Sequence, residues 1–226
     1  MPLLIGRQRT RDANVKHEPG SLSASHTDVQ PARSEAAFEM VALAASAGGL
    51  AALSKVLSRL PKDFPASIAI VQHLDPSHRS LMAEILARRT PLPVKEAQHG
   101  ETMRPGTIYI APPNNHLLIN ADGTLSLSQA ELVHFVRPSA DLLFESVAAS
   151  YKDHAIAVVL SGSGVDGQMG VQAIKKMAGT VIVQDTQTSE FVGMPEAALK
   201  TGCADFVLPL DEISGALVKL VMGNKL

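Results

Sequence analysis

The chain of 226 residues has no tryptophan, one cysteine and few aromatic residues, which make up 4% of it. The single cysteine, Cys203, excludes a disulfide within the chain and is typical of a protein in a reducing compartment. The scarcity of aromatic rings disfavours the stacking platforms that bind single-stranded nucleic acid. No run approaches the roughly 20 apolar residues that a membrane-spanning helix needs. We therefore expect no membrane insertion.

An excess of charge of one sign is also lacking, because 20 Lys and Arg residues stand against 22 Asp and Glu residues. Without surplus positive charge to offset phosphates, nucleic acid is not an expected partner. The chain begins without the pattern of a secretory signal, which together with the lone cysteine predicts a cytoplasmic protein. Hydrophobic residues make up 46% of the chain, enough for a sizeable core in one α/β domain.

The composition of the chain changes near residue 37. Residues 1–37 mix basic and acidic residues with prolines and a serine-rich middle, and contain few large apolar side chains. Such a segment cannot bury enough apolar surface to offset its ordering entropy. We predict a disordered polar tail over 1–37 and a folded α/β domain over 38–226. A basic interaction arm is the alternative for the tail, and its interspersed acidic residues disfavour it.

Apolar periodicity in the folded part predicts strands that alternate with helices. The predicted strands are 40–45, 67–72, 155–160, 180–184 and 206–208, and the predicted helices are 50–60, 80–89, 140–151, 168–178, 195–201 and 210–222. This order predicts a doubly wound, mostly parallel sheet with helices on both faces. In the segment 94–127, four short apolar runs and an Asp122-Gly123 turn predict a short antiparallel hairpin insertion. Gly179 is the predicted left-handed residue that ends the helix over 168–178.

Ser46 follows the first predicted strand, in the run AASAGG over 44–49. At a sharp turn from strand to helix, a hydroxyl stands clear of the sheet beside free backbone N–H groups that can stabilise an oxyanion. The turn therefore suits a nucleophile. Two alternatives stay open: Ser46 as the N-cap of the next helix, and the turn as a degraded dinucleotide-binding glycine loop.

His73 and Asp166 follow two other predicted strands, in IVQHLDP and LSGSGVDG. A histidine at the end of the strand beside Ser46 can act as a general base. An aspartate at a third strand end could orient and stabilise its imidazole. The alternatives are a histidine that only caps a strand end and an aspartate that serves a turn or caps the next helix. Together the three residues are the parts of a Ser-His-Asp hydrolase.

Several motifs occur in the order ASAGG (45–49), VQH (71–73), RPGTIYIAPPNNHL (104–117), RPSADLLFESVA (137–148), LSGSGVDG (160–167) and GMP (193–195). In this register the chain resembles the catalytic domain of the CheB-type chemotaxis protein-glutamate methylesterases, from about 41 to 221. The resemblance implies a Rossmann-like α/β catalytic domain with Ser46 as nucleophile, His73 as base and Asp166 as orienting acid. The residues expected to line its oxyanion site are Ala47, Gly48, Ser163, Gly164 and Met194.

The activity that this resemblance implies is hydrolysis of γ-glutamyl methyl esters on chemoreceptor helices, often with deamidation of glutamine. The expected substrate is a methylated chemoreceptor or a related signalling protein. Because residues 1–37 lack the strand–helix pattern of a receiver domain, a separate regulatory protein is a further expected partner. The resemblance implies no cofactor and no metal, and the histidines lack metal-ligand spacing.

Two other kinds of protein remain as hypotheses. One is a non-catalytic scaffold that keeps the fold and loses a member of the triad, although all three residues are present. The other is a dinucleotide-binding module, which needs an acidic residue at the end of the second strand, where this chain has His73.

Overall fold

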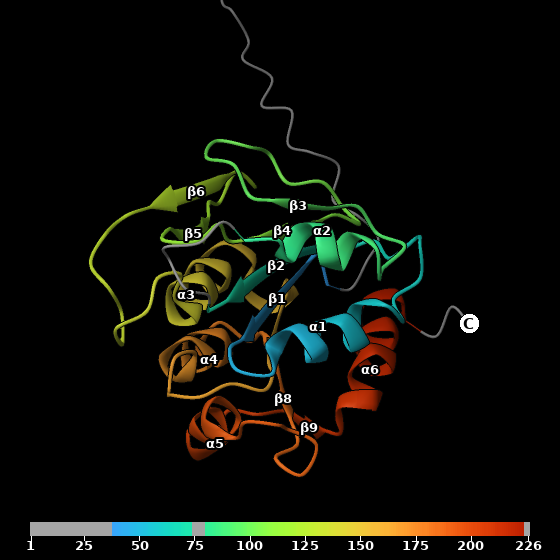
Figure 1. Ribbon diagram of the computed structural model, residues 1–226, viewed down its shortest axis with the longest axis vertical. Helices are drawn as coiled ribbons and strands as arrows, with labels where there is room; N and C mark the ends of the chain where they lie inside the picture. The colour runs from blue at the N-terminus through green and yellow to red at the C-terminus, as the bar shows by residue number, and fades with distance from the viewer. Residues whose placement is uncertain (1–37, 74–79, 224–226) are drawn as a thin grey trace, which may run out of the picture. The chain divides into compact units, whose positions relative to one another are not determined.

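A seven-stranded sheet forms the centre of the structure, a computed structural model that describes residues 38–73 and 80–223 (Figure 1). The tail predicted over 1–37 lies outside the described residues. The strands, in spatial order, are β3 (Val94–Glu96), β4 (Ile108–Ile110), β2 (Ser67–Gln72), β1 (Met40–Ala45), β7 (Ala155–Val159), β8 (Thr180–Gln184) and β9 (Phe206–Leu208).

All neighbouring strands of this sheet pair in parallel. β1 lies in the middle, with β2, β4 and β3 on one side of it and β7, β8 and β9 on the other; the chain completes the first side before it starts the second. This order confirms the predicted doubly wound, mostly parallel sheet. Every residue of β1, β2 and β7 is buried, which explains why these strands appear in the sequence as continuous apolar runs rather than as alternating ones.

Helices cover both faces of the sheet. One core contains side chains of α1 (Gly49–Leu57), α2 (Met82–Ala87) and α6 (Leu210–Met222), and the other contains those of α3 (Ala140–Tyr151), α4 (Gln168–Lys176) and α5 (Gly193–Lys200). Successive side chains of β1 point to opposite faces of the sheet, so Leu43 packs in the first core and Ala44 in the second. A short 3₁₀ helix, Lys152–His154, joins α3 to β7. Within the described ranges, no helix is long and apolar enough to cross a membrane.

The predicted hairpin is formed by β5 (His116–Ile119) and β6 (Leu125–Ser128), which pair antiparallel in a sheet of their own. It packs against α3, where the Ile119 N–H donates to Ser146 Oγ at 3.0 Å. The other two short strands of the 94–127 segment, β3 and β4, join the main sheet in parallel instead. The reason is burial: all three residues of β4 are covered on both faces.

The end of α4 differs from the prediction. Ala178, rather than Gly179, has the left-handed conformation, with φ of 65°. The N–H of Gly179 donates to Ile174 O at 2.9 Å and that of Ala178 donates to Lys175 O at 3.0 Å, which is a Schellman motif with Ala178 at C′. Gly179 is needed for space, because a Cβ there would lie 2.8 Å from Ile174 Cγ2.

Candidate active site

Ser46, His73 and Asp166 follow β1, β2 and β7, which are three adjacent strands at the centre of the sheet. Backbone hydrogen bonds join the three strand ends: His73 N–H donates to Ala45 O at 3.1 Å, and Ser46 N–H donates to Ser161 O at 3.0 Å. The direction of winding reverses at β1, so Ser46 stands at the topological switch point where ligands of such sheets bind.

The turn after β1 leaves the Ser46 hydroxyl free. The N-cap of α1 is Gly48, with φ of 72°, so the alternative of Ser46 as the N-cap is wrong. The Gly49 N–H donates to Ser46 O at 2.9 Å and closes the turn. This turn needs a left-handed residue at Gly48, which favours glycine. The N-cap of α1 therefore lies two residues after Ser46. Among the residues described, nothing forms a hydrogen bond with the Ser46 Oγ.

Unused backbone donors occur in the serine turn and in the loop after β7. The N–H groups of Ala47 and Gly48 donate to no acceptor in the described part of the chain, and neither do those of Ser163 and Gly164 in the exposed loop after β7. A helix start or a glycine loop with unpaired N–H groups can bind an oxygen that carries negative charge. These four residues therefore stay the predicted donors of the oxyanion site.

Met194, a predicted site-lining residue, is bonded to the glycine loop. Its N–H donates to Gly162 O at 2.9 Å, and its side chain is 1% exposed. A Cβ on Gly162 would collide with Met194 Sδ and lie 2.9 Å from Ser46 Cβ. Met194 therefore supports the glycine loop from beneath. The GMP motif begins α5 rather than forming a loop, because Pro195 is tolerated in the first turn of a helix.

The His73 imidazole contacts the Asp166 carboxylate, with Nε2 2.8 Å from Oδ2. Both side chains are shielded from solvent, at 11% and 3% exposure. An ionised carboxylate can only accept hydrogen bonds, so Nε2 is the nitrogen that donates, and in the neutral imidazole Nδ1 is then the unprotonated nitrogen. The ends of β1 and β2 lie side by side, which puts His73 next to Ser46. The structure contains no hydrogen bond between the Ser46 hydroxyl and this imidazole.

Asp166 does not cap the helix that follows it, whose N-cap is Gly167. Its carboxylate instead lies at the start of α3. Oδ2 accepts from the Ala140 N–H at 2.5 Å, while Oδ1 accepts from Ser139 Oγ at 2.8 Å and from the Asp141 N–H at 3.1 Å. The N-terminal end of a helix favours an anion, because its free N–H groups and dipole point toward it.

The protonation of Asp166 follows from these contacts. Burial alone would raise the pKa of its carboxyl group. The hydrogen bonds from His73, Ala140 and Asp141, together with the His73 charge, outweigh burial and lower the pKa below its ordinary value. Asp166 is therefore ionised near neutral pH and can stabilise a protonated imidazole.

A second buried carboxylate, Asp141, lies beside the first. Its Oδ1 accepts from the Gly170 N–H at 2.7 Å and so joins the starts of α3 and α4, while Oδ2 lies 3.1 Å from His134 Nε2. Burial raises the pKa of Asp141, and the negative charge of Asp166 raises it further, against the lowering effect of the Gly170 hydrogen bond. Two adjacent carboxylates at one helix start thus have pKa shifts of opposite sign.

Sequence reasoning missed the residues that hold this site in place. Gln72 is one example: its Nε2 donates to Ser46 O at 2.7 Å and to His73 O at 3.1 Å. Ser161 Oγ donates to Ala47 O at 2.9 Å and ties the glycine loop to the serine turn. The available signal was that both residues are polar and stand at the ends of apolar strands.

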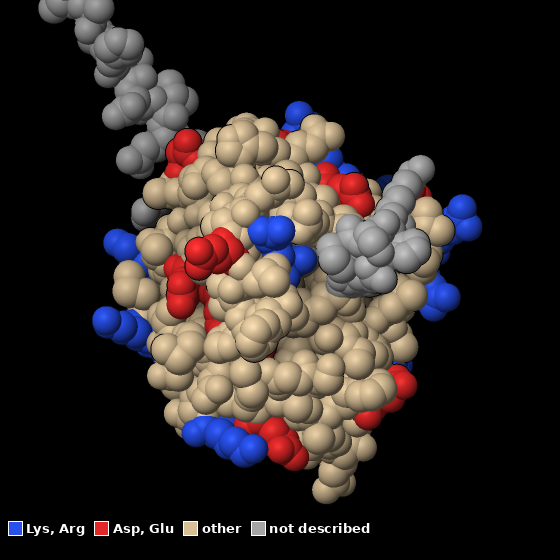
Figure 2. All heavy atoms as spheres, turned by 60° about the vertical axis from the view of Figure 1, so that its left-hand side comes forward, with Lys and Arg blue, Asp and Glu red and all other residues tan. Residues whose placement is uncertain are grey.

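The described residues around the carboxyl ends of the strands present a surface of mixed charge. The arrowheads of β1 and β2 point to the left in Figure 1, and Figure 2 brings that side forward. Lys, Arg, Asp and Glu are scattered over this face between larger uncharged areas. The described residues contain no group of three or more His, Cys, Asp and Glu side chains placed to hold a metal ion.

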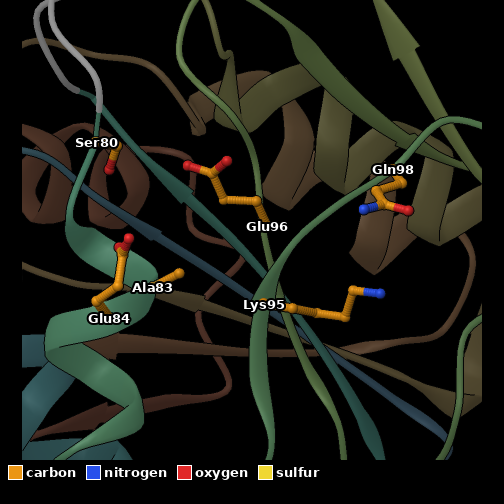
Figure 3. A pocket seen from close by; sticks show the side chains of 6 residues that line it. All are labelled: Ser80, Ala83, Glu84, Lys95, Glu96 and Gln98. Carbon is orange, nitrogen blue, oxygen red and sulfur yellow. The ribbon is translucent and has the colours of Figure 1, made fainter.

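A cavity of about 240 Å³ lies apart from the three residues, between α2 and β3 (Figure 3). The side chains that line it have mixed charge and no nucleophile–base pair; they are Ser80, Ala83, Glu84, Lys95, Glu96 and Gln98. Lys95 is already paired, with its Nζ 2.6 Å from Glu101 Oε1. We therefore place the candidate chemistry at Ser46, His73 and Asp166.

Comparison with known proteins identifies one family. The profile of the CheB methylesterase family matches residues 41–217. In solved structures, the fold is similar to the CheB methylesterase catalytic domain of Thermotoga maritima, with a TM-score of 0.79 and 38% identity, over 81% of this chain and 99% of that one.

Curated relatives have names that agree with this profile. A protein-glutamate methylesterase/protein-glutamine glutaminase of Anaeromyxobacter dehalogenans is 44% identical over 85% of this chain and 56% of its own length. One of Burkholderia pseudomallei is 41% identical over 86% of this chain and 57% of its own length. A Leptospira interrogans protein, provisionally given the same name, is 38% identical over 83% of this chain and 97% of its own length.

Proposed function

The chain belongs to the CheB methylesterase family, and from this premise we propose that it is a serine hydrolase that removes methyl esters from glutamate residues of proteins. A chemoreceptor or a related signalling protein is the proposed substrate, and a cytoplasmic protein without a cofactor fits this role. Deamidation of glutamine is the second proposed reaction, since the same attack on a side-chain carbonyl expels ammonia instead of methanol. The observation that supports the proposal most is the His73–Asp166 hydrogen bond beside Ser46.

The proposed reaction begins at Ser46. Its Oγ attacks the ester carbonyl carbon while His73 Nδ1 takes the hydroxyl proton, and Asp166 stabilises the imidazolium that forms. The tetrahedral intermediate then collapses: His73 returns the proton to the methoxy oxygen, the C–O bond breaks and methanol leaves. Water attacks the remaining acyl-enzyme by the same route and releases glutamate and free Ser46.

Backbone N–H groups are proposed to stabilise the oxyanion of each intermediate. Ala47 and Gly48 supply donors from the serine turn, and Gly164 and Ser163 supply them from the facing loop. The proposal uses the main chain of Ser163 and not its hydroxyl. Removing one such donor from an oxyanion site typically costs about 10²–10³ in kcat.

Methanol release tests the proposed function. Membranes that contain chemoreceptors carrying radiolabelled methyl esters are incubated with the protein, and volatile label is counted. The protein should release label with time, and Ser46→Ala should not. Release at equal rates by both proteins would contradict the assignment of Ser46, whereas no release by either would contradict the methylesterase activity on these receptors.

Regulation is a further part of the proposal. We propose that residues 1–37 form a polar tail outside the catalytic domain over 38–226, and that a separate protein regulates activity. The test is deletion of residues 1–36, which should change the rate of methanol release by less than about threefold, or about 0.65 kcal/mol of barrier. Strong activation on deletion would show that the tail inhibits the enzyme.

A further inference from the structure

A carboxylate that the proposed mechanism does not use lies beside the serine turn. A Cβ placed on Gly48 would lie 2.8 Å from Glu190 Oε2 and 3.1 Å from Glu190 Cβ, so the Glu190 side chain runs along the Gly48 backbone. Gly48 is two residues after Ser46 and is the N-cap of α1. Glu190 thus borders the place where the attacked carbonyl must lie.

Glu190 is held in this place through its own loop. The next residue, Phe191, donates its N–H to Ser161 Oγ at 3.0 Å and accepts from the Gly162 N–H at 3.0 Å. The loop before α5 is therefore bonded to the loop after β7, which faces the serine turn. The carboxylate itself is exposed and forms neither a hydrogen bond nor an ion pair with the residues that the structure describes.

A carboxylate is electrostatically unfavourable beside an oxyanion site. A negative charge near a developing oxyanion raises the energy of the transition state, and more so where protein and substrate exclude water. A cation brought by the substrate would reverse the sign of that effect. The exposed side chains of Phe191 and Val192, at 42% and 37%, would in addition contact the aliphatic stem of a long cationic residue.

We propose that Glu190 determines specificity in this active site by pairing with a Lys or Arg side chain that lies near the target glutamate of the substrate protein. The inference rests on the proposed function and specifies its substrate: esters flanked by a cation are preferred to those flanked by an anion. Glu190 recognises the substrate and takes no part in proton transfer.

Paired peptides test this preference. Two synthetic helical peptides each contain one glutamyl γ-methyl ester and differ only at a position one helical turn away, which is Lys in one and Glu in the other. Methanol release gives kcat/KM for each with the full-length protein. Wild type should favour the Lys peptide by about fivefold, and Glu190→Gln should reduce that ratio to about one. Glu190→Lys should invert it.

A matched control is Glu196→Gln, because Glu196 is an exposed carboxylate on α5 that pairs with Lys200 at 3.4 Å. This variant should keep the wild-type ratio. Raising NaCl to about 0.5 M should weaken the wild-type preference, since an exposed pair is screened. Equal rates on the two peptides for wild type, or an unchanged ratio in Glu190→Gln, would overturn the inference and leave the methylesterase function intact.

Binding gives a readout that does not depend on turnover. Fluorescence anisotropy with the Ser46→Ala protein and labelled peptides should show tighter binding of the Lys peptide, and the preference should vanish in the Ser46→Ala, Glu190→Gln double variant. If wild type hydrolyses neither peptide, the proposed function fails on these substrates. Equal affinities of the two peptides would then overturn the inference about Glu190 by themselves.

Discussion

His73 and Asp166 meet through the Nε2 atom of the imidazole, 2.8 Å from the Asp166 Oδ2. In the familiar Ser-His-Asp triad the carboxylate binds Nδ1–H and the serine faces Nε2. Here the two nitrogens exchange roles, so Nδ1 is the nitrogen available to Ser46. The physical requirement is unchanged, because the carboxylate still fixes the tautomer and leaves an unprotonated nitrogen for the hydroxyl.

Replacement of the nucleophile is the first test. Ser46→Ala should reduce turnover of methyl esters by on the order of 10⁶, the usual loss for a triad serine. The fold should be retained, because the Ser46 hydroxyl does not cap α1. Methanol release and circular dichroism measure the two effects. Ser58→Ala, at the other end of α1, is the control and should keep activity. Turnover above about a tenth of wild type would refute this role of Ser46.

The orienting carboxylate gives a second prediction. Asp166→Asn should lower kcat by about 10⁴, because an amide cannot hold His73 in the required tautomer. It also exchanges an acceptor for a donor that faces the N–H groups of Ala140 and Asp141. The variant should therefore unfold at a lower urea concentration than wild type at pH 7.

The destabilisation of Asp166→Asn should depend on pH. The folded-state pKa of Asp166 lies below its ordinary value, so its carboxylate stabilises the fold above about pH 4, the unfolded value, and this stability is lost as pH falls through the folded value. Urea midpoints of variant and wild type should converge as pH falls below 4. A gap that is the same at pH 3 and pH 7 would contradict the assignment of an anion-stabilising site.

Asp141 should behave in the opposite way. Burial raises its pKa in the folded state, so Asp141 destabilises the fold increasingly as pH rises through that raised value. Asp141→Asn keeps an oxygen for the Gly170 N–H and removes the buried charge. The melting temperature of Asp141→Asn minus that of wild type should therefore be larger at pH 7 than at pH 4. A difference that falls with rising pH would show that the His134 ion pair outweighs the cost of burial.

The close contact at Gly162 gives a prediction about geometry. Gly162→Ala puts a methyl group 2.9 Å from Ser46 Cβ and against Met194. The serine must move, and a displacement near 1 Å can cost about 10² in rate. Activity should fall at least tenfold, as measured by single-turnover methanol release, while the far-ultraviolet circular dichroism stays unchanged.

Gly215→Ala is the matched control for this substitution. Gly215 lies inside α6 with open space where the methyl group would stand, so alanine should stabilise the helix by about 1 kcal/mol and keep activity. Normal activity in Gly162→Ala would mean that the serine turn adapts freely, against the tight packing described here.

Much of the fold followed from local patterns. The bounds of β1, β2 and α3 were predicted correctly. Burial on both faces of a parallel sheet produces a continuous apolar run in a strand, and a buried helix face produces apolar residues at helical spacing, so both patterns can be read from neighbouring residues. The left-handed residue that follows α4 was missed by one position. There the pattern correctly indicated a glycine, but Gly179 is needed for space beside Ile174 and the backbone oxygens of Lys152 and Ala155, while Ala178 takes the left-handed conformation.

The sequence by itself determined that Ser46 and His73 directly follow two strands and that Asp166 lies in the loop after a third, and parallel pairing then puts these strand ends at one edge of the sheet. Only the tertiary structure decided how the side chains meet. The anchoring of Asp166 on the start of α3, the choice of Nε2, and the approach of Glu190 to Gly48 all join segments that are far apart in the chain. Such contacts depend on packing and rotamers, which no local periodicity encodes.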